Sequence, residues 1–400
     1  MRAEATWPYT SSMWPFGWLS DLREVATALG RARTVARADD EVPIDEPRSP
    51  EGEVAKCASL LRQALTRASA RYHRALNREL AGLLRRLGPE ERLEADRIYR
   101  RLRAENPSEC ATDWNHALLL KHSGRFGEAL AALDAYRSAG GVSDKAFHWN
   151  TGICATGAGL GQKALDAWLA EHFKIALADD GMPSGGFPVV QVRISSRGPL
   201  GGPSCEPSPG APGYEYGWVR PRSPCHGVLL TPLVMDEPTD VGDVLLRDGA
   251  PVRFKEFDGR RVATFPLLKV LARGDYRRYR FRAEQEDAGL IAALEEALPR
   301  GAQLYVHDEE VAWLCHKCAT SGAPDPHEHD GPAALRFVSG KLAVPPGVSL
   351  GDVRERLSES LRLRPAVRLA VPALHRDDGD LAAAARDEVL WVQLRREIGV

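Results

Sequence analysis

Residues 111–133, ATDWNHALLLKHSGRFGEALAAL, and residues 146–168, AFHWNTGICATGAGLGQKALDAW, decide the fold of the N-terminal half, because they are two copies of one pattern. Five positions match, each at an offset of 35 residues: Trp114 with Trp149, Asn115 with Asn150, Gly124 with Gly159, Ala129 with Ala164, and Leu130 with Leu165. A constant offset over several positions is typical of an internal repeat. The sequence therefore predicts two copies of one structural unit.

The shared residues suit a pair of antiparallel helices. The aromatic residue of the first helix packs inside the hairpin, the glycine opens the turn, and the alanine lets the helices cross closely. This pattern resembles the tetratricopeptide repeat, whose usual period is one residue shorter. The resemblance covers about residues 75–178, where Ala95 belongs to a degenerate earlier unit, and it departs from the family at Gly161, where an aromatic residue is expected. It does not extend into the C-terminal half.

The resemblance implies a short solenoid that binds a protein partner in its concave groove. In the family, exposed residues of the first helix of each unit line that groove. By this resemblance, the candidate partner contacts are Asn115, His116, Leu119, Asn150 and Ile153. The leading hypothesis from the sequence is a protein-binding scaffold or adaptor.

The helical periodicity of the sequence ends at Gly181. The next residues are rich in Pro, Gly and Ser, and short β-type runs follow at 187–194, 226–235, 243–249, 251–257, 260–268 and 276–281. Asp248-Gly249 and Asp258-Gly259 predict hairpin turns between them. Before the repeats, leucines spaced three and four residues apart predict one long helix over 54–87.

These patterns predict a multidomain α+β protein. An N-terminal α-helical solenoid of the tetratricopeptide kind precedes a C-terminal α+β domain with a mainly antiparallel sheet. The predicted parts are an N-terminal arm, helix and linker (1–53), the helical repeat domain (54–180), a β-rich α+β domain (186–332), and a C-terminal βαβα segment packed on it (333–400).

The composition is that of an ordinary globular protein. Hydrophobic residues make up 44% of the 400 residues and charged residues 27%, and the formal net charge of −2 gives no global attraction to nucleic acid or acidic membranes. No apolar run is long enough to span a bilayer. Seven cysteines, an odd number, fit a reducing compartment better than a disulfide framework. We therefore expect a cytoplasmic bacterial protein without a membrane partner.

The segment WLCHKCATSGAPDPHEHDG (313–331) holds the candidate metal site. Cys315 and Cys318 offer two thiolates from one turn, and His327 and His329 follow on a Pro-rich loop, so the four residues form a candidate zinc set. Cys205 and Cys225 are alternative ligands to the histidines. Free thiols and a solvated histidine loop are the other interpretation. A zinc-dependent enzyme with its active site in the C-terminal half is the alternative function, although no catalytic motif is visible.

The segment YRRYRFR (276–282) carries the second candidate. Strand alternation sends Arg278, Arg280 and Arg282 to one face and Tyr279 and Phe281 to the other. A row of arginines can grip phosphates, which makes nucleic-acid binding a further alternative. We favour a different interpretation, in which the arginines lie on an exposed strand face or edge and their charge prevents pairing with other strands.

Overall fold

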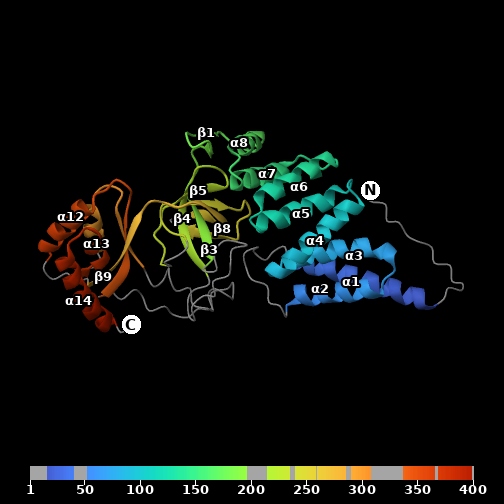
Figure 1. The fold of residues 1–400 in the computed structure, drawn as a ribbon, viewed down its shortest axis with the longest axis horizontal. Coiled ribbons are helices and arrows are strands. Elements are labelled where there is room, and N and C mark those ends of the chain that lie inside the picture. The colour runs from blue at the N-terminus through green and yellow to red at the C-terminus, as the bar shows by residue number, and fades with distance from the viewer. Residues whose placement is uncertain are drawn as a thin grey trace. The chain divides into compact units, whose positions relative to one another are not determined.

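The computed structural model describes residues 16–39, 52–195, 214–234, 239–257, 259–284, 290–307, 337–364 and 368–398. The chain divides into two compact units, 1–147 and 148–400. The first unit is helical, and the second combines helices with three sheets (Figure 1). The division falls inside the second repeat, within helix α7 (Lys145–Gly157), so the second unit contains most of that repeat hairpin.

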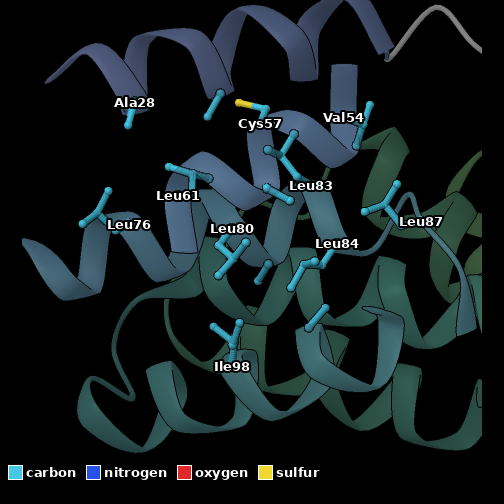
Figure 2. Packing of buried hydrophobic residues seen from close by; sticks show 14 of the residues in the cluster. Ala28, Val54, Cys57, Leu61, Leu76, Leu80, Leu83, Leu84, Leu87 and Ile98 are labelled. Atoms are coloured by element: carbon cyan, nitrogen blue, oxygen red, sulfur yellow. The ribbon is translucent and has the colours of Figure 1, made fainter. Parts of the chain in front are cut away.

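Leucine-rich helices form the core of the first unit. Figure 2 shows Leu61, Leu76, Leu80 and Ile98 gathered in this core with other buried side chains. The helices before the repeats are α1 (Phe16–Asp39), α2 (Glu53–Arg67), α3 (Ala70–Leu84) and α4 (Pro89–Glu105). The long helix predicted over 54–87 is wrong, because the chain breaks between α2 and α3.

Two extended residues make that break. Ala68 and Ser69 have ψ angles of 148° and 151°, which lie outside the helical region. Neither residue is Gly or Pro, so the sequence carries no breaker signal at this point. The break lets α2 and α3 pack their apolar faces against each other within one core.

The first repeat hairpin consists of α5 (Cys110–His122) and α6 (Phe126–Ser138). Gly124 lies between the helices with a φ of 71°, the left-handed conformation that glycine adopts without strain. Ala129 is fully buried, and the ring of Trp114 lies 5.2 Å from that of Tyr136. The predicted roles of the aromatic, the glycine and the alanine are confirmed in this hairpin.

The second hairpin consists of α7 and α8 (Gly161–Ala170), with Gly159 in the same turn conformation at φ 75°. Trp168 is fully buried and lies directly on Gly152, where an added Cβ would stand 2.4 Å from the indole. A Cβ on Gly161 would stand 1.8 Å from the carbonyl oxygen of Gly181. That oxygen belongs to the turn between the short strands β1 (Ala176–Leu177) and β2 (Pro183–Ser184).

A six-stranded sheet follows, in the order β3-β4-β5-β6-β8-β7. A further parallel pairing of β3 with β8 closes five of these strands into a ring around a small apolar core of Val192, Ile194, Val219, Leu229, Leu233, Leu245 and Leu267. The other neighbours in the ring are antiparallel. The strands are β3 (Val190–Ser195), β4 (Tyr214–Pro221), β5 (His226–Leu229), β6 (Val244–Arg247), β7 (Arg253–Phe257) and β8 (Arg260–Ala272).

One of the two predicted hairpins is present in this sheet. β7 and β8 pair across Gly259, which has a φ of 68°. The hairpin predicted at Asp248-Gly249 is wrong, because β6 and β7 both pair with β8. Gly249 instead packs on Trp149, and a Cβ there would lie 2.7 Å from the indole.

A four-stranded antiparallel sheet completes the second unit, in the order β10-β11-β9-β12. The predicted strand at 276–281 lies in this sheet as β9, paired with β11 and β12. Tyr279 and Phe281 bury against helix residues such as Val353 and Leu374. The strands are β9 (Arg277–Glu284), β10 (Gln303–Val306), β11 (Phe337–Val344) and β12 (Arg368–Ala370), and the helices are α9 (Leu290–Ala297), α12 (Leu350–Arg362), α13 (Pro372–Asp377) and α14 (Leu381–Ile398).

Within the parts of the chain that the structure describes, no helix combines the length and apolarity needed to cross a membrane.

Candidate functional site

A pocket of about 420 Å³ lies between α4, α5 and α6 of the first unit. Small or apolar residues supply much of its lining, and Arg100, Arg103 and Glu128 add charge. The remaining lining residues are Ala104, Pro107, His116, Leu120, Ala131 and Ala132. An apolar recess with a few charged groups is the usual character of a site that takes one side chain of a ligand.

Asp96 organises the charges beside this pocket. Its carboxylate accepts hydrogen bonds from His116 Nε2 at 2.6 Å, Arg125 Nη1 at 2.9 Å and Arg100 Nε at 3.2 Å. Burial opposes ionisation, but these hydrogen bonds outweigh it and lower the pKa of Asp96 to about 2. Asp96 therefore holds Arg125 and also Arg100, which lines the pocket.

His116 is the buried polar group of the pocket wall. Burial lowers the pKa of its imidazole, and the hydrogen bond to Asp96 only partly offsets this effect, so the ring is neutral at pH 7. Because Asp96 accepts from Nε2, the proton lies on that nitrogen and Nδ1 is an acceptor. Among the described residues, Nδ1 has no hydrogen-bond partner. The atom is buried in the wall, so the pocket does not expose it.

Arg103 lies in the last turn of α4, two turns beyond Asp96, and faces a different acid. Its Nε lies 3.3 Å from Asp113 Oδ1, whose carboxylate is almost fully buried. Burial raises the pKa of Asp113. The guanidinium itself is about half exposed, with 46% of its side-chain surface accessible, so it can bind a second acceptor from a ligand.

The five predicted partner contacts occupy different environments. His116, Leu119 and Ile153 are buried, with exposed fractions of 6%, 2% and 1%. Asn115 is half-buried and donates from Nδ2 to the carbonyl oxygen of Ala111, and Asn150 is half-buried in α7. Of the five, His116 lines the pocket. A partner-binding role for Asn115 and Asn150 stays a prediction.

Sequence reasoning missed Arg100, Arg103 and Glu128. The sequence shows an excess of arginine in this region, but an exposed helix face is rich in charge whether or not it binds anything. The signal that could have found the pocket is the run of small residues on α6, Ala131 and Ala132, opposite Ala104 at the end of α4. Small residues leave space between helices where larger ones would fill it.

The predicted metal ligands Cys315, Cys318, His327 and His329, and the alternative ligand Cys205, lie outside the described residues. In the ranges that the structure covers, no three His, Cys, Asp or Glu side chains gather in a way that could hold a metal ion. A zinc site and a zinc-dependent enzyme stay predictions.

Cys225, the other alternative ligand, is fully buried in the second unit. Its Sγ lies 3.5 Å from Thr156 Oγ1 of α7 and 3.6 Å from Ser223 Oγ. Burial raises the pKa of the thiol to about 11. Without a bound metal, the side chain is therefore a thiol at neutral pH, and its role as an alternative ligand stays a prediction.

His226 follows Cys225 but takes another partner. Its Nδ1 lies 2.5 Å from Ser223 Oγ, and burial lowers its pKa to about 4. The ring is therefore neutral at pH 7. Lys269 Nζ donates to the carbonyl oxygen of Gly157 at 3.2 Å nearby. These contacts form a buried cluster of polar groups between α7 and the six-stranded sheet, and not an open site. We call this cluster the polar seam.

The arginine row of β9 lies on one face, as the alternation predicts. Tyr279 and Phe281 are buried on the other. The Arg282 guanidinium lies 4.4 Å from the Trp391 ring centroid of α14, and Arg278 Nη1 lies 4.0 Å from Asp240 Oδ2. All three arginines thus have interaction partners within the chain. Phosphate binding by this row stays a prediction.

No family model matches the chain, and none of the curated proteins matches it. Two solved structures, titled MamA AMB-1 and MamA MSR-1, each share 12% identity with it at a TM-score of 0.28. The matches cover 38% of this chain and 91% and 95% of the respective structures. A likeness at this level carries no functional conclusion.

Proposed function

We propose that the first unit is a protein-binding module and that the pocket between α4, α5 and α6 receives a peptide segment of the partner. The pocket supports this proposal, because it joins an apolar recess of about 420 Å³ to half-exposed arginines in a helical hairpin repeat. The chain as a whole would then act as a scaffold or adaptor.

The chemistry of the pocket indicates what the peptide would supply. The alanines and Pro107 leave room for one apolar side chain. Arg103 would bind a carbonyl or carboxylate oxygen of the peptide, and the half-exposed Arg100 would offer a second donor at the pocket. One apolar anchor flanked by polar contacts is a common arrangement in peptide recognition.

The test uses selection followed by a matched substitution. Random peptides displayed on phage are selected on the full chain, and the affinity of the selected peptides is measured by fluorescence anisotropy. Ala131→Trp fills the pocket from an exposed position and should abolish binding. Ala111→Trp, also at an exposed alanine but outside the pocket lining, is the control and should leave the affinity unchanged.

Two outcomes would contradict the proposal. Selection that yields no peptide with saturable binding would show that the pocket does not take a peptide. Selected peptides that bind Ala131→Trp as tightly as the unchanged chain would place the binding surface elsewhere. Circular dichroism of both variants checks that the helices are intact.

A further inference from the structure

One face of the six-stranded sheet carries aromatic and basic side chains side by side. The register places Trp218 of β4 opposite Gln191 of β3, Gln191 beside Thr264 of β8, and Thr264 opposite Arg253 of β7. Strand alternation adds Tyr216 to this face, and it adds Lys255, Phe257 and Arg260 from the β7–β8 hairpin. We call Tyr216, Trp218, Arg253, Lys255, Phe257 and Arg260 the aromatic-basic face.

The aromatic rings of this face lie close together and are partly exposed. The Phe257 ring lies 5.3 Å from the Trp218 ring, and 51% of Phe257 is exposed. The Arg253 guanidinium lies 3.8 Å from the centroid of the Tyr216 ring. Phe257 is exposed, whereas Trp218 and Tyr216 are half-buried, so the face presents one exposed ring supported by a second ring and lying near a stacked arginine. An exposed aromatic side chain is costly to hydrate, and a ligand that covers it would remove that cost.

The cations of the face lack acidic partners. Among the described residues, Arg253, Lys255 and Arg260 have no salt bridge, and Arg253 Nε has no hydrogen-bond partner. Arg253 contacts Gln191 Oε1, a neutral acceptor, at 3.5 Å. Glu256 projects from the opposite side of β7, by alternation. The positive charge on this face is therefore not neutralised by the described part of the sheet.

Arginines of the first unit show the contrast. Salt bridges join Arg31 to Glu53, Arg62 to Glu94, and Arg125 to Asp96 and Glu128. Ion pairs of this kind are common on exposed helix surfaces and do not by themselves indicate a ligand. On the aromatic-basic face, Arg253 instead stacks on Tyr216 without an acidic partner, an arrangement that suits a negatively charged ligand with flat surfaces.

We propose that the aromatic-basic face binds single-stranded nucleic acid. Unpaired bases would stack on Phe257 and Trp218, and the phosphates would contact Arg253, Lys255 and Arg260. A duplex hides its base faces, so it would meet only the cations. An acidic protein segment would meet the same cations but would offer no row of rings, which makes it the weaker match.

The experiment titrates the full chain into a fluorescein-labelled oligothymidylate of about 15 nucleotides, a length that exceeds one sheet face. Anisotropy should rise with saturation, and the affinity should fall as salt is added, because phosphate contacts release counterions. A duplex of equal length should bind more weakly than the single strand.

Matched substitutions distinguish binding at the aromatic-basic face from nonspecific attraction by positive charge elsewhere on the protein. Phe257→Ala should weaken binding about tenfold, the loss expected for one stacked base. Phe254 has the same 51% exposure but projects from the other side of β7, so Phe254→Ala should leave the affinity unchanged. Arg260→Glu should reduce both the affinity and the salt dependence, whereas Arg356→Glu on α12, equally exposed and equal in charge change, should not.

Three results would overturn the proposal. The first is no binding of the oligothymidylate at low salt. The second is an equal loss for Phe254→Ala and Phe257→Ala. The third is displacement of the oligothymidylate by polyglutamate at an equal concentration of charge, which would assign the face to an acidic protein segment instead.

Discussion

Phe126 begins the second helix of the first repeat, and Gly161 stands at the corresponding place in the second repeat, 35 residues later. Phe126 is buried within its own hairpin. Gly161 leaves that space to the chain itself, since the carbonyl oxygen of Gly181 lies where a side chain would begin. At this position, the first repeat therefore has a buried side chain, whereas the second repeat has a glycine against which the following turn packs.

A second pair of positions differs in the same way. Ala117 and Leu133 of the first hairpin correspond to Gly152 and Trp168 of the second, so a smaller residue on one helix accompanies a larger one on the other. The second hairpin then packs on the sheet of its own unit, through Trp149 on Gly249 and through the seam at Thr156 and Cys225. The comparison indicates that one repeat sequence can leave a pocket beside its hairpin in one copy and pack on the rest of its own unit in the other.

Gly161→Phe tests the docking role with the largest expected effect. No rotamer can place a Cβ at 1.8 Å from a carbonyl oxygen, so the turn must move, and we expect a loss of about 3 kcal/mol or more in the free energy of unfolding. Urea denaturation with hydrogen exchange in α7 and α8 measures it. Gln162→Phe, at the exposed neighbour, is the control and should cost little. Equal losses in the two variants would contradict the docking role.

Because the side chain of Trp168 occupies the space beside Gly152, substitutions at these two positions should have strongly non-additive effects on the free energy of unfolding. Trp168→Leu alone leaves a cavity and should cost about 3 kcal/mol, and Gly152→Ala alone meets the indole and should cost about 2 kcal/mol. The double variant recreates the alanine and leucine of the first hairpin, so its loss should fall below the sum by about 1 to 2 kcal/mol. Additive losses would show that the two positions do not share one packing space.

Acid should lower the free energy of unfolding of the second unit through His226, which lies in the polar seam between α7 and the six-stranded sheet. The pKa of His226 is about 4 in the folded chain, against 6.5 for an unperturbed histidine, so the unfolded state binds the proton more tightly. Stability is therefore complete above pH 6.5 and is lost as pH falls toward 4, by about 2 kcal/mol at pH 5. Urea midpoints at pH 7 and pH 5 measure this, and His226→Asn should remove most of the difference. An unchanged difference in that variant would assign the acid sensitivity to other groups.

Asp96→Asn tests the charge cluster of the first unit with the smallest expected effect. The folded pKa of Asp96 is about 2, below its ordinary 3.8, so its stabilisation is present above pH 3.8 and is lost as pH falls toward 2. Because Arg100 and Arg125 are partly exposed, we expect the substitution to cost about 1 kcal/mol at pH 7. Glu53→Gln, in an exposed pair with Arg31, should cost less. Equal effects would show that burial adds nothing at Asp96.

The repeat sequence predicts helices, turns and the buried alanines well, because each of these depends on one or two local residues. Gly124 and Gly159 adopt the turn conformation that their position in the pattern requires. The break at Ala68 and Ser69 carries no such local signal, because packing of α2 on α3 favours it. The pocket also escapes prediction, since α4, α5 and α6 form it together.

The sheet shows the same limit. Strand β4 begins within a Pro, Gly and Ser-rich segment that indicates irregular structure, yet its residues YEYGWVRP alternate between half-buried and buried over most of their length. The sequence does carry a strand signal here, because the aromatic residues Tyr214, Tyr216 and Trp218 occupy alternate positions. The closure of the ring by β3 and β8 has no such signal, because a parallel pair between strands about 70 residues apart depends on the whole unit.

A photo-crosslinking residue placed at Ala131 or at Asp166 tests the account most directly. The two positions correspond in the repeats and are both exposed, on α6 and α8. We predict that a peptide selected on the full chain crosslinks from position 131, beside the pocket, and not from position 166. Crosslinking from position 166 alone, or equally from both, would contradict the proposal that the peptide binds beside the first hairpin and the account of the second hairpin as packed within its own unit.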